Sequence, residues 1–218
     1  MSTFLETGVF QGVNVRFQSR YWKEVLSCDI VAEYVEDAKN YVKDCKNVFI
    51  KNVSSDIFLK EFIKRYNEEK RTDTVFMYLD AHFYNPNHYI EEVSEEDNWV
   101  IIKELQALED FSNCVILVHD FDCSGLGHCC FDGAPLGFPL ILEHLRKINP
   151  NFYFYVNTKE FCDIYDIGSV KGNKDVLIDK RTMRVVKQSN SSDRLRYRGI
   201  LYCTPTKLNL SNFKLVRA

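Results

Sequence analysis

Acidic residues and histidines in this sequence gather at the ends of short apolar runs that are typical of buried strands. Two such runs, residues 74–80 and 114–119, lead into the motifs Asp80-Ala81-His82 and His119-Asp120. In open α/β sheets ligands sit beyond the carboxyl ends of the strands, so these side chains are expected to meet in space. Carboxylates and imidazoles at that density either bind a divalent cation or carry out acid–base chemistry.

Each of these residues has a candidate role and an alternative. A hard cation such as Mg²⁺ prefers oxygen ligands, which favours Asp80 and Asp120, and His119 beside them would permit Mn²⁺ or Fe²⁺ instead. His82 is the candidate base, since a histidine with a pKa of about 6.5 can accept a proton from a substrate hydroxyl. The alternatives are a structural ion pair for the carboxylates and hydrogen-bonded core positions for the histidines.

The beginning of the chain combines a strand, a glycine turn and an acidic residue after a second strand. Gly8 and Gly12 lie in the stretch Phe4-Leu5-Glu6-Thr7-Gly8-Val9-Phe10-Gln11-Gly12, where glycine permits a tight turn close to a ligand. Asp29 follows about 20 residues later, where a carboxylate meets ribose hydroxyls in nucleotide-binding sheets. The spacing Glu-x-Gly-x-x-x-Gly lacks a second glycine for a pyrophosphate and favours a ligand with ribose but no diphosphate. An ordinary turn, and a helix N-cap at Asp29, are the alternatives.

The elements that must position these residues alternate along the chain, as in an α/β doubly wound, Rossmann-like domain with a mostly parallel sheet. The predicted strands are residues 3–9, 24–29, 47–53, 74–80 and 114–119, and the predicted helices are residues 13–22, 32–45, 57–69, 99–109 and 139–147. Residues 151–157 and 198–204 are predicted to form an antiparallel closing pair. Residues 85–97 are expected to form a loop. We expect residues 1–218 to form a single domain with a polar, irregular insertion at 158–196 and a hairpin at 176–178 and 184–186.

Composition narrows the class of protein. The chain has 218 residues, of which 45% are hydrophobic, and a net charge of −3, which suits one globular domain and argues against a duplex nucleic-acid binder. No apolar run reaches the roughly 18 residues of a membrane span, and the N-terminus enters a strand without room for a signal peptide. Eight cysteines, mostly in or near predicted strands, suit buried reduced thiols in a cytoplasmic protein.

Two clusters outside the strand ends allow further interpretations. Cysteine and histidine residues could bind a structural zinc ion, although their spacing fits no usual zinc motif; they are Cys123, His128, Cys129 and Cys130. A late run of arginines is most often a solvated face but could grip a phosphate or an acidic substrate; its members are Arg181, Arg184, Arg194, Arg196 and Arg198.

The glycine-turn motif, Asp29 and the strand ends Leu79-Asp80-Ala81-His82 and His119-Asp120-Phe121 resemble those of class I S-adenosylmethionine-dependent methyltransferases. Within that superfamily the chain looks most like the macrocin-type O-methyltransferases of sugar and antibiotic biosynthesis, over residues 3–160. The resemblance implies that the glycine turn, with Glu6, Gly8 and Gly12, holds the methionine part of S-adenosylmethionine and that Asp29 holds the ribose. Val53 stands where many relatives carry an acidic residue near the adenine, so Ser54 and its neighbour Ser55 would serve there.

The resemblance also implies a metal bound by carboxylates after the fourth and fifth strands. Asp80 and Asp120 match these positions, His119 replaces one carboxylate, and His82 stands where the family's base would be. We therefore expect an S-adenosylmethionine-dependent O-methyltransferase acting on a hydroxyl of a small molecule such as a sugar, with possible help from Mg²⁺ or another divalent cation.

Two other functions stay open at this point. A nucleic-acid methyltransferase would use the late arginines, although the sequence has no Asn/Asp-Pro-Pro-Tyr/Phe motif of amino-methylating enzymes. A non-catalytic member would keep the fold as an interaction module. No partner other than a small hydroxylated substrate is expected from the residues, and a homo-oligomer is left open.

Overall fold

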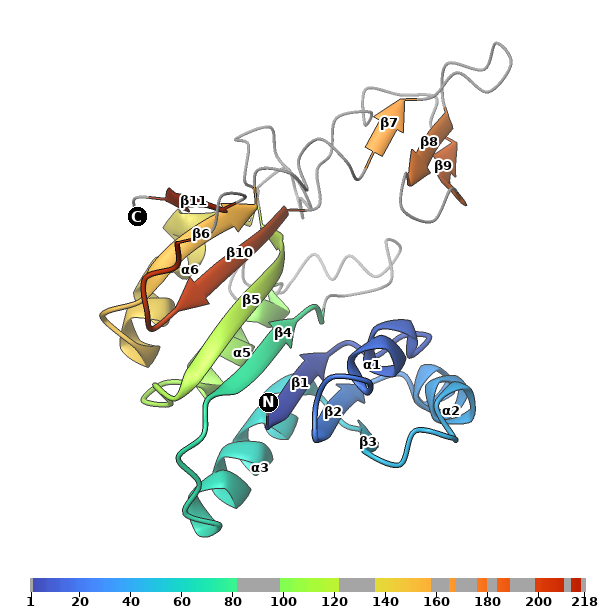
Figure 1. The fold of residues 1–218 in the computed structure, drawn as a ribbon, viewed down its shortest axis with the longest axis horizontal. Helices are drawn as coiled ribbons and strands as arrows, with labels where there is room; N and C mark the ends of the chain where they lie inside the picture. The colour runs from blue at the N-terminus through green and yellow to red at the C-terminus, as the bar shows by residue number, and fades with distance from the viewer. Residues whose placement is uncertain are drawn as a thin grey trace, which may run out of the picture.

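A computed structural model describes residues 2–81, 99–121, 136–157, 165–167, 176–179, 184–188, 199–209 and 213–216, with the backbone alone for Asp120 and Asn157 and for the three short strands between residues 165 and 188. Its centre is an eight-stranded sheet with the order β11-β6-β10-β5-β4-β1-β2-β3 (Figure 1). The strands on the N-terminal side are β1 (Thr3–Thr7), β2 (Glu24–Asp29), β3 (Val48–Asn52), β4 (Val75–Leu79) and β5 (Cys114–Phe121). All neighbouring pairs among these five strands are parallel.

Three further strands complete the sheet: β6 (Tyr153–Asn157), β10 (Gly199–Thr204) and β11 (Phe213–Val216). β10 lies between β5 and β6 and is antiparallel to both, so β6 runs in the same direction as β5. This is the predicted closing pair, and with the parallel strands it confirms the predicted α/β doubly wound fold with a mostly parallel sheet. β11, an exposed edge strand paired with β6, was missed by the sequence analysis.

The helices cover the two faces of the sheet. On one face, α1 (Val13–Gln18) and α2 (Ala32–Tyr41) bury Val15, Val35 and Ala38 against β1 and β2. On the other face lie α3 (Ser55–Glu68), α5 (Val100–Ala107) and α6 (Phe138–Ile148), which share the larger core. β1 is buried along its whole length because it is covered on both sides, as expected of a central parallel strand.

The order of the strands reverses between β1 and β4, because the chain first winds outward to β3 and then returns to the other side of β1. In doubly wound sheets this switch point opens a crevice beyond the carboxyl ends of the strands, and ligands bind there. The residues that follow β1 and β4 are therefore the first candidates for a functional site.

The fifth strand is longer than predicted. Residues 114–119 were expected to form it, with His119 as the last residue and Asp120 beyond the end, but β5 continues to Phe121. The extension exists because β10 pairs along it, with Ile200 opposite His119 and an irregular register next to Gly199. Asp120 and Phe121 therefore belong to the strand and not to a loop that follows it.

A separate three-stranded antiparallel sheet contains β7 (Tyr165–Ile167), β8 (Val176–Asp179) and β9 (Arg184–Gln188). The pairing of β8 with β9 confirms the predicted hairpin. Within the described ranges, no helix is long and apolar enough to cross a membrane. The cysteines described there, Cys28, Cys45, Cys114 and Cys203, are free thiols.

Candidate functional site

The turn after β1 has the strained geometry that its glycines predict. Gly8 and Gly12 have φ angles of +80° and +72°, and Phe10 between them has φ +45°, a conformation that side chains other than glycine seldom adopt. The backbone amides of Gly8 and Val9 donate to the carbonyl oxygen of Cys28 at 3.0 and 2.9 Å. The turn is thus fixed to the end of β2 and passes over the carboxyl end of β1.

The turn also lies directly against the end of β4. A Cβ atom placed on Gly8 would be 2.8 Å from the backbone oxygen of Asp80, which leaves no room for a side chain. The hydroxyl oxygen of Thr7 accepts hydrogen bonds from the backbone amides of Asp80 and Ala81 at 3.1 and 3.3 Å. Thr7 and Gly8 therefore join β1 to β4 at the switch point, and the sequence analysis assigned no role to Thr7.

Glu6 is buried beneath this turn. Its two carboxyl oxygens accept hydrogen bonds from the Asn14 amide at 2.6 Å and from the Ser27 hydroxyl at 3.0 Å. Burial raises the pKa of Glu6 to about 8, against the lowering effect of these two bonds. Glu6 is therefore largely protonated at neutral pH, and a cation brought next to it would favour its ionised form.

Asp29 holds the loops around it. One carboxylate oxygen accepts from the Phe10 amide at 3.1 Å and the other from the Val31 amide at 3.0 Å. Val31, not Asp29, is the N-cap residue of α2, so the simple capping alternative does not describe Asp29. A carboxylate has about four acceptor sites, and two backbone bonds leave capacity for ligand hydroxyls.

Two residues next to Asp29 expose apolar side chains: Phe10, whose backbone amide donates to Asp29, and Ile30, which follows Asp29 in the sequence. The exposed fractions are 47% for Phe10 and 73% for Ile30. The Asn52 side-chain amide donates to the backbone oxygens of Asp29 and Ile30 at 2.9 and 3.1 Å and so fixes this loop to β3. A carboxylate near exposed apolar side chains can accept hydrogen bonds from ligand hydroxyls while the apolar side chains cover the flat aromatic ring of the same ligand.

The two serines predicted to lie near an adenine are arranged differently from one another. Ser54 is the N-cap residue of α3, but its hydroxyl donates to the Asp56 carboxylate at 2.8 Å and caps no amide. Ser55 is buried, and its hydroxyl interacts with the carboxyl of Glu104 on α5. Of the two, Ser54 is the more accessible to a ligand.

Asp80 and His119 meet, as expected for residues from adjacent strands. The Nδ1 atom of His119 is 2.6 Å from Oδ1 of Asp80. The register explains this contact: Leu79 pairs with Val118, so the next positions along β4 and β5 are Asp80 and His119. The ring of Tyr78 lies beside that of His119, with 5.5 Å between their centroids. The result is a carboxylate–imidazole pair at the crevice.

The predicted metal site can be followed only in part. Two of its three ligands, Asp80 and His119, contact one another through Oδ1 and Nδ1. His82 and the side chain of Asp120 lie outside the described residues. The same holds for the side chains of the late arginines and for the zinc candidates, which are Cys123, His128, Cys129 and Cys130. Among the residues that the structure does describe, no three His, Cys, Asp or Glu side chains are grouped to hold a metal ion. The metal assignment stays a prediction.

A buried acid that the sequence analysis missed lies below the switch point. Glu104 on α5 is completely buried, and burial raises its pKa to about 8. A signal was present in the sequence, because Glu104 falls on the same helical face as Ile101, Leu105 and Leu108, which form the buried side of α5. A single acid on an otherwise apolar helix face is uncommon and points to a specific role.

No protein-family model and no curated protein sequence matches the chain. Similar folds occur among solved structures. The N-methyltransferase NodS from Bradyrhizobium japonicum is 14% identical, with 94% of this chain and 86% of NodS covered and a TM-score of 0.44. An rRNA methylase from Streptococcus thermophilus is 10% identical, with coverage of 93% and 85% and a TM-score of 0.41.

The YcgJ protein from Bacillus subtilis is 16% identical at a TM-score of 0.35, and the match covers 55% of this chain and 44% of YcgJ. These matches concern architecture only, and the fold assignment rests on the order and direction of the strands.

Proposed function

We propose that the protein is an S-adenosylmethionine-dependent O-methyltransferase acting on a small hydroxylated molecule, such as a sugar or a glycosylated metabolite. One observation carries the proposal: the glycine turn, the Asp29 carboxylate and the Asp80–His119 pair lie together at the carboxyl ends of β1, β2, β4 and β5. The proposal is the function that best uses a ribose-type carboxylate next to an acid–base pair.

The residues present fit an adenosyl ligand. Asp29 retains acceptor capacity for ribose hydroxyls, and the exposed side chains of Phe10 and Ile30 offer apolar cover for a base. Ser54, the residue after Val53 and the N-cap of α3, is the polar group that would serve near the adenine. When bound, S-adenosylmethionine supplies an electrophilic methyl group.

The chain's own residues would hold the acceptor and remove its proton. In a neutral imidazole, a proton on Nδ1 leaves the lone pair on Nε2. Because Nδ1 of His119 is paired with Asp80, the carboxylate fixes this tautomer and stabilises the imidazolium that forms when Nε2 takes a hydroxyl proton. His119 is therefore the proposed base and Asp80 the residue that orients it, while His82 stays a predicted base.

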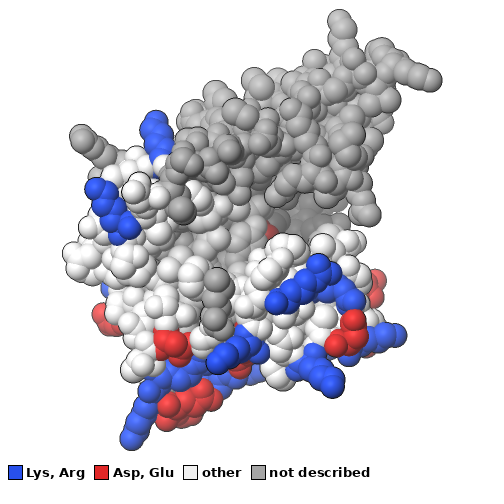
Figure 2. Space-filling view, viewed as in Figure 1, with Lys and Arg blue, Asp and Glu red and all other residues white. Residues whose placement is uncertain are grey.

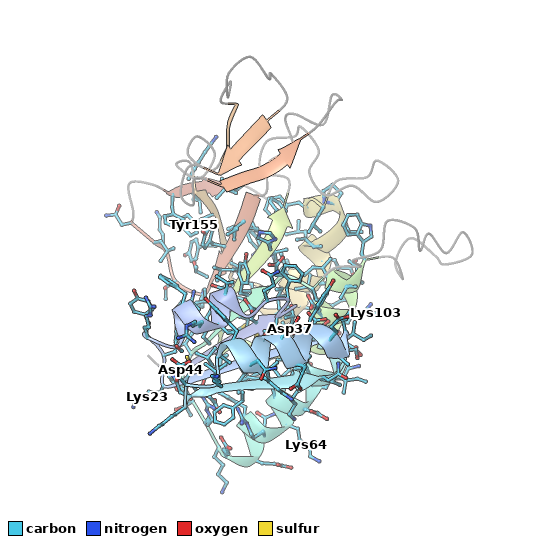
Figure 3. The ribbon with its side chains drawn as sticks, turned by 90° about the vertical axis from the view of Figure 1, so that its right-hand side faces the viewer. Lys23, Asp37, Asp44, Lys64, Lys103 and Tyr155 are labelled. Atoms are coloured by element: carbon cyan, nitrogen blue, oxygen red, sulfur yellow. The ribbon has the colours of Figure 1, made fainter. Side chains whose placement is uncertain are left out.

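Calorimetric titration with S-adenosylhomocysteine tests the proposed ligand. Wild type should bind one equivalent, and Asp29→Ala should bind at least about tenfold more weakly because the ribose loses its acceptor. Asp37→Ala, an exposed acid on α2 that is labelled in Figure 3, is the matched control and should bind like wild type. Equal affinity of wild type and Asp29→Ala would contradict the ribose assignment.

The chemistry is tested separately, by methyl transfer to a panel of hydroxylated acceptors. His119→Ala should lose about two to four orders of magnitude in turnover while keeping its affinity for S-adenosylhomocysteine within about twofold. Affinity for RNA or DNA that falls steeply with salt would favour a nucleic-acid methyltransferase instead. A wild-type protein with no affinity for the nucleoside would favour a non-catalytic interaction module.

A further inference from the structure

Glu104 is the least explained side chain of the described core. Both of its carboxyl oxygens are buried without a hydrogen-bond partner, and a buried polar group in that state destabilises the fold. The hydroxyls of Thr7 and Ser55 are the polar groups that interact with it and lower its pKa, but neither completes a hydrogen bond of good geometry. A leucine would fill this position on the apolar face of α5 without the penalty.

The position of Glu104 connects it to the crevice. α5 packs against α3, and Ser55 is the first residue of α3, while Thr7 is the last residue of β1. Lys103, the neighbour of Glu104, is labelled in Figure 3 and marks this turn of α5. Glu104 thus lies under the junction of β1 and β4, on the side of the sheet opposite to α1 and α2.

Thr7 supplies the reason for an acceptor at this place. Its hydroxyl oxygen accepts two hydrogen bonds, from the amides of Asp80 and Ala81. A hydroxyl has two acceptor lone pairs and one proton, so Thr7 still has a proton to donate. The carboxyl of Glu104 interacts with this hydroxyl and is an acceptor for its proton.

We propose that Glu104 is a positioning residue that, through Thr7, sets the distance between the glycine turn of β1 and the Asp80 turn of β4. Gly8 and Asp80 are already in backbone contact there, so a shift of Thr7 moves the cofactor side of the crevice relative to the acid–base pair. The inference rests on the proposed function, because it assigns Glu104 to the binding of the same nucleoside.

A double-mutant cycle tests this inference, with the affinity for S-adenosylhomocysteine and the melting temperature as the two measurements. Glu104→Leu and Thr7→Val should each weaken binding by about five- to tenfold, and the double variant should be no worse than either, because one contact is removed in all three. Glu104→Gln and Thr7→Ser keep a partner for the bond and should bind within about twofold of wild type. Gln106→Leu, exposed on the same helix, is the control and should change nothing.

The melting temperature separates positioning from a structural role. Glu104→Leu should melt at or above the wild-type temperature, because it removes an unpaired buried carboxyl, and still bind more weakly. A fall in melting temperature and affinity together would make Glu104 a structural residue and overturn the inference, as would additive losses in the double variant. If Glu104→Leu does not fold, the same question is decided by the affinity of three other variants. Thr7→Val should bind more weakly than wild type, whereas Thr7→Ser and Glu104→Gln should bind like wild type. Wild-type affinity in every variant would overturn the inference and leave the proposed function standing, whereas no binding by wild type would overturn both.

Discussion

The two ends of the central sheet treat their charges in opposite ways. At the amino ends of β1, β2 and β4, Arg71 pairs with Asp73 at 2.8 Å and with Glu24 at 3.4 Å, and it donates to the Thr3 hydroxyl at 2.6 Å. Arg65 adds a second ion pair to Glu24 at 3.0 Å. The Arg71 bond holds the pKa of Asp73 well below its usual range. This end gathers its charges into a paired network, and the face in Figure 2 shows both signs close together.

At the carboxyl ends of the strands, two acids are buried, and their burial destabilises the fold. Glu6 and Glu104 are buried, and burial raises the pKa of each to about 8. Phe10 and Ile30 expose apolar surface, and Phe10 adopts a strained backbone angle. Perturbed acids and strain concentrate at functional sites because a binding site is shaped for its ligand and not for stability. The difference between the two ends supports the proposal that the site lies at the carboxyl ends of the strands.

The largest effect is expected where the turn meets β4. Gly8→Ala places a Cβ atom 2.8 Å from the backbone oxygen of Asp80 at a φ of +80°, which should lower the free energy of unfolding by about 2–4 kcal/mol and abolish nucleoside binding. Gly137→Ala is the control, because its nearest neighbour would be a Pro139 side-chain atom at 3.6 Å. Denaturant unfolding and calorimetry measure both, and a Gly8→Ala protein with normal affinity would refute the close packing of turn and strand.

The amino end should show a loss of stability without a loss of binding. Arg71→Ala leaves Asp73 and Glu24 without their shared partner and should destabilise the protein by about 2–3 kcal/mol. Affinity for S-adenosylhomocysteine, measured well below the melting temperature, should stay within about twofold of wild type. Weakened binding would mean that the two ends are coupled and that their separation does not hold.

The two ends should also respond to pH with opposite signs. An acid whose pKa is higher in the folded state stabilises the fold only while protonated, so the stability from Glu6 and Glu104 is lost as pH rises from about 4.5, the ordinary value, towards 8. For Asp73 the folded pKa is lowered, so its stability is present above about 3.8 and is lost as pH falls below that value.

Melting temperatures between pH 5 and 8.5 measure the first of these effects, at about 2–4 °C per kcal/mol. Glu104→Leu should flatten the decline over that range, since one of the two acids is gone. A decline of the same slope in wild type and Glu104→Leu would contradict the raised pKa of Glu104.

The smallest effect is expected at the exposed rim. Ile30 is 73% exposed, so Ile30→Ser should leave the melting temperature unchanged and weaken nucleoside binding by about two- to fivefold, through lost apolar cover of the base. Leu215→Ser, an exposed position on the far edge strand β11, is the control and should bind normally. Equal affinity in both variants would remove Ile30 from the site.

Local patterns in the sequence predicted the elements but not their side-chain partners. β2 was predicted with its observed bounds, because an apolar run between turn residues defines a parallel strand. The extension of β5 to Phe121 depends on pairing with β10, nearly 80 residues away, and no local pattern contains it. β11 was missed because a four-residue edge strand with two exposed positions has no clear periodicity.

For the candidate site, too, the sequence suggested residues but not the contacts between their side chains. Gly8, Asp29, Asp80 and His119 were proposed from strand ends and turn chemistry, and in the structure Gly8 lies against Asp80, Asp80 contacts His119, and Asp29 accepts from the Phe10 amide of the glycine turn. The direct contact of Asp80 with His119 needs the register of β4 and β5, which the sequence does not contain. Thr7 became visible only through its tertiary neighbours, and the helical face of Glu104 signalled a buried acid without showing that it lies beside Thr7.

The most direct measurement is a crystal structure of the protein grown with S-adenosylhomocysteine. Density for the nucleoside should lie beyond β1 and β2, with its ribose hydroxyls on Asp29, its base between Phe10 and Ile30, and its sulfur towards the Asp80–His119 pair. Nucleoside density at another place would contradict the proposed methyltransferase. So would the absence of density at saturating nucleoside, in a crystal whose packing leaves the carboxyl ends of β1 and β2 open to solvent.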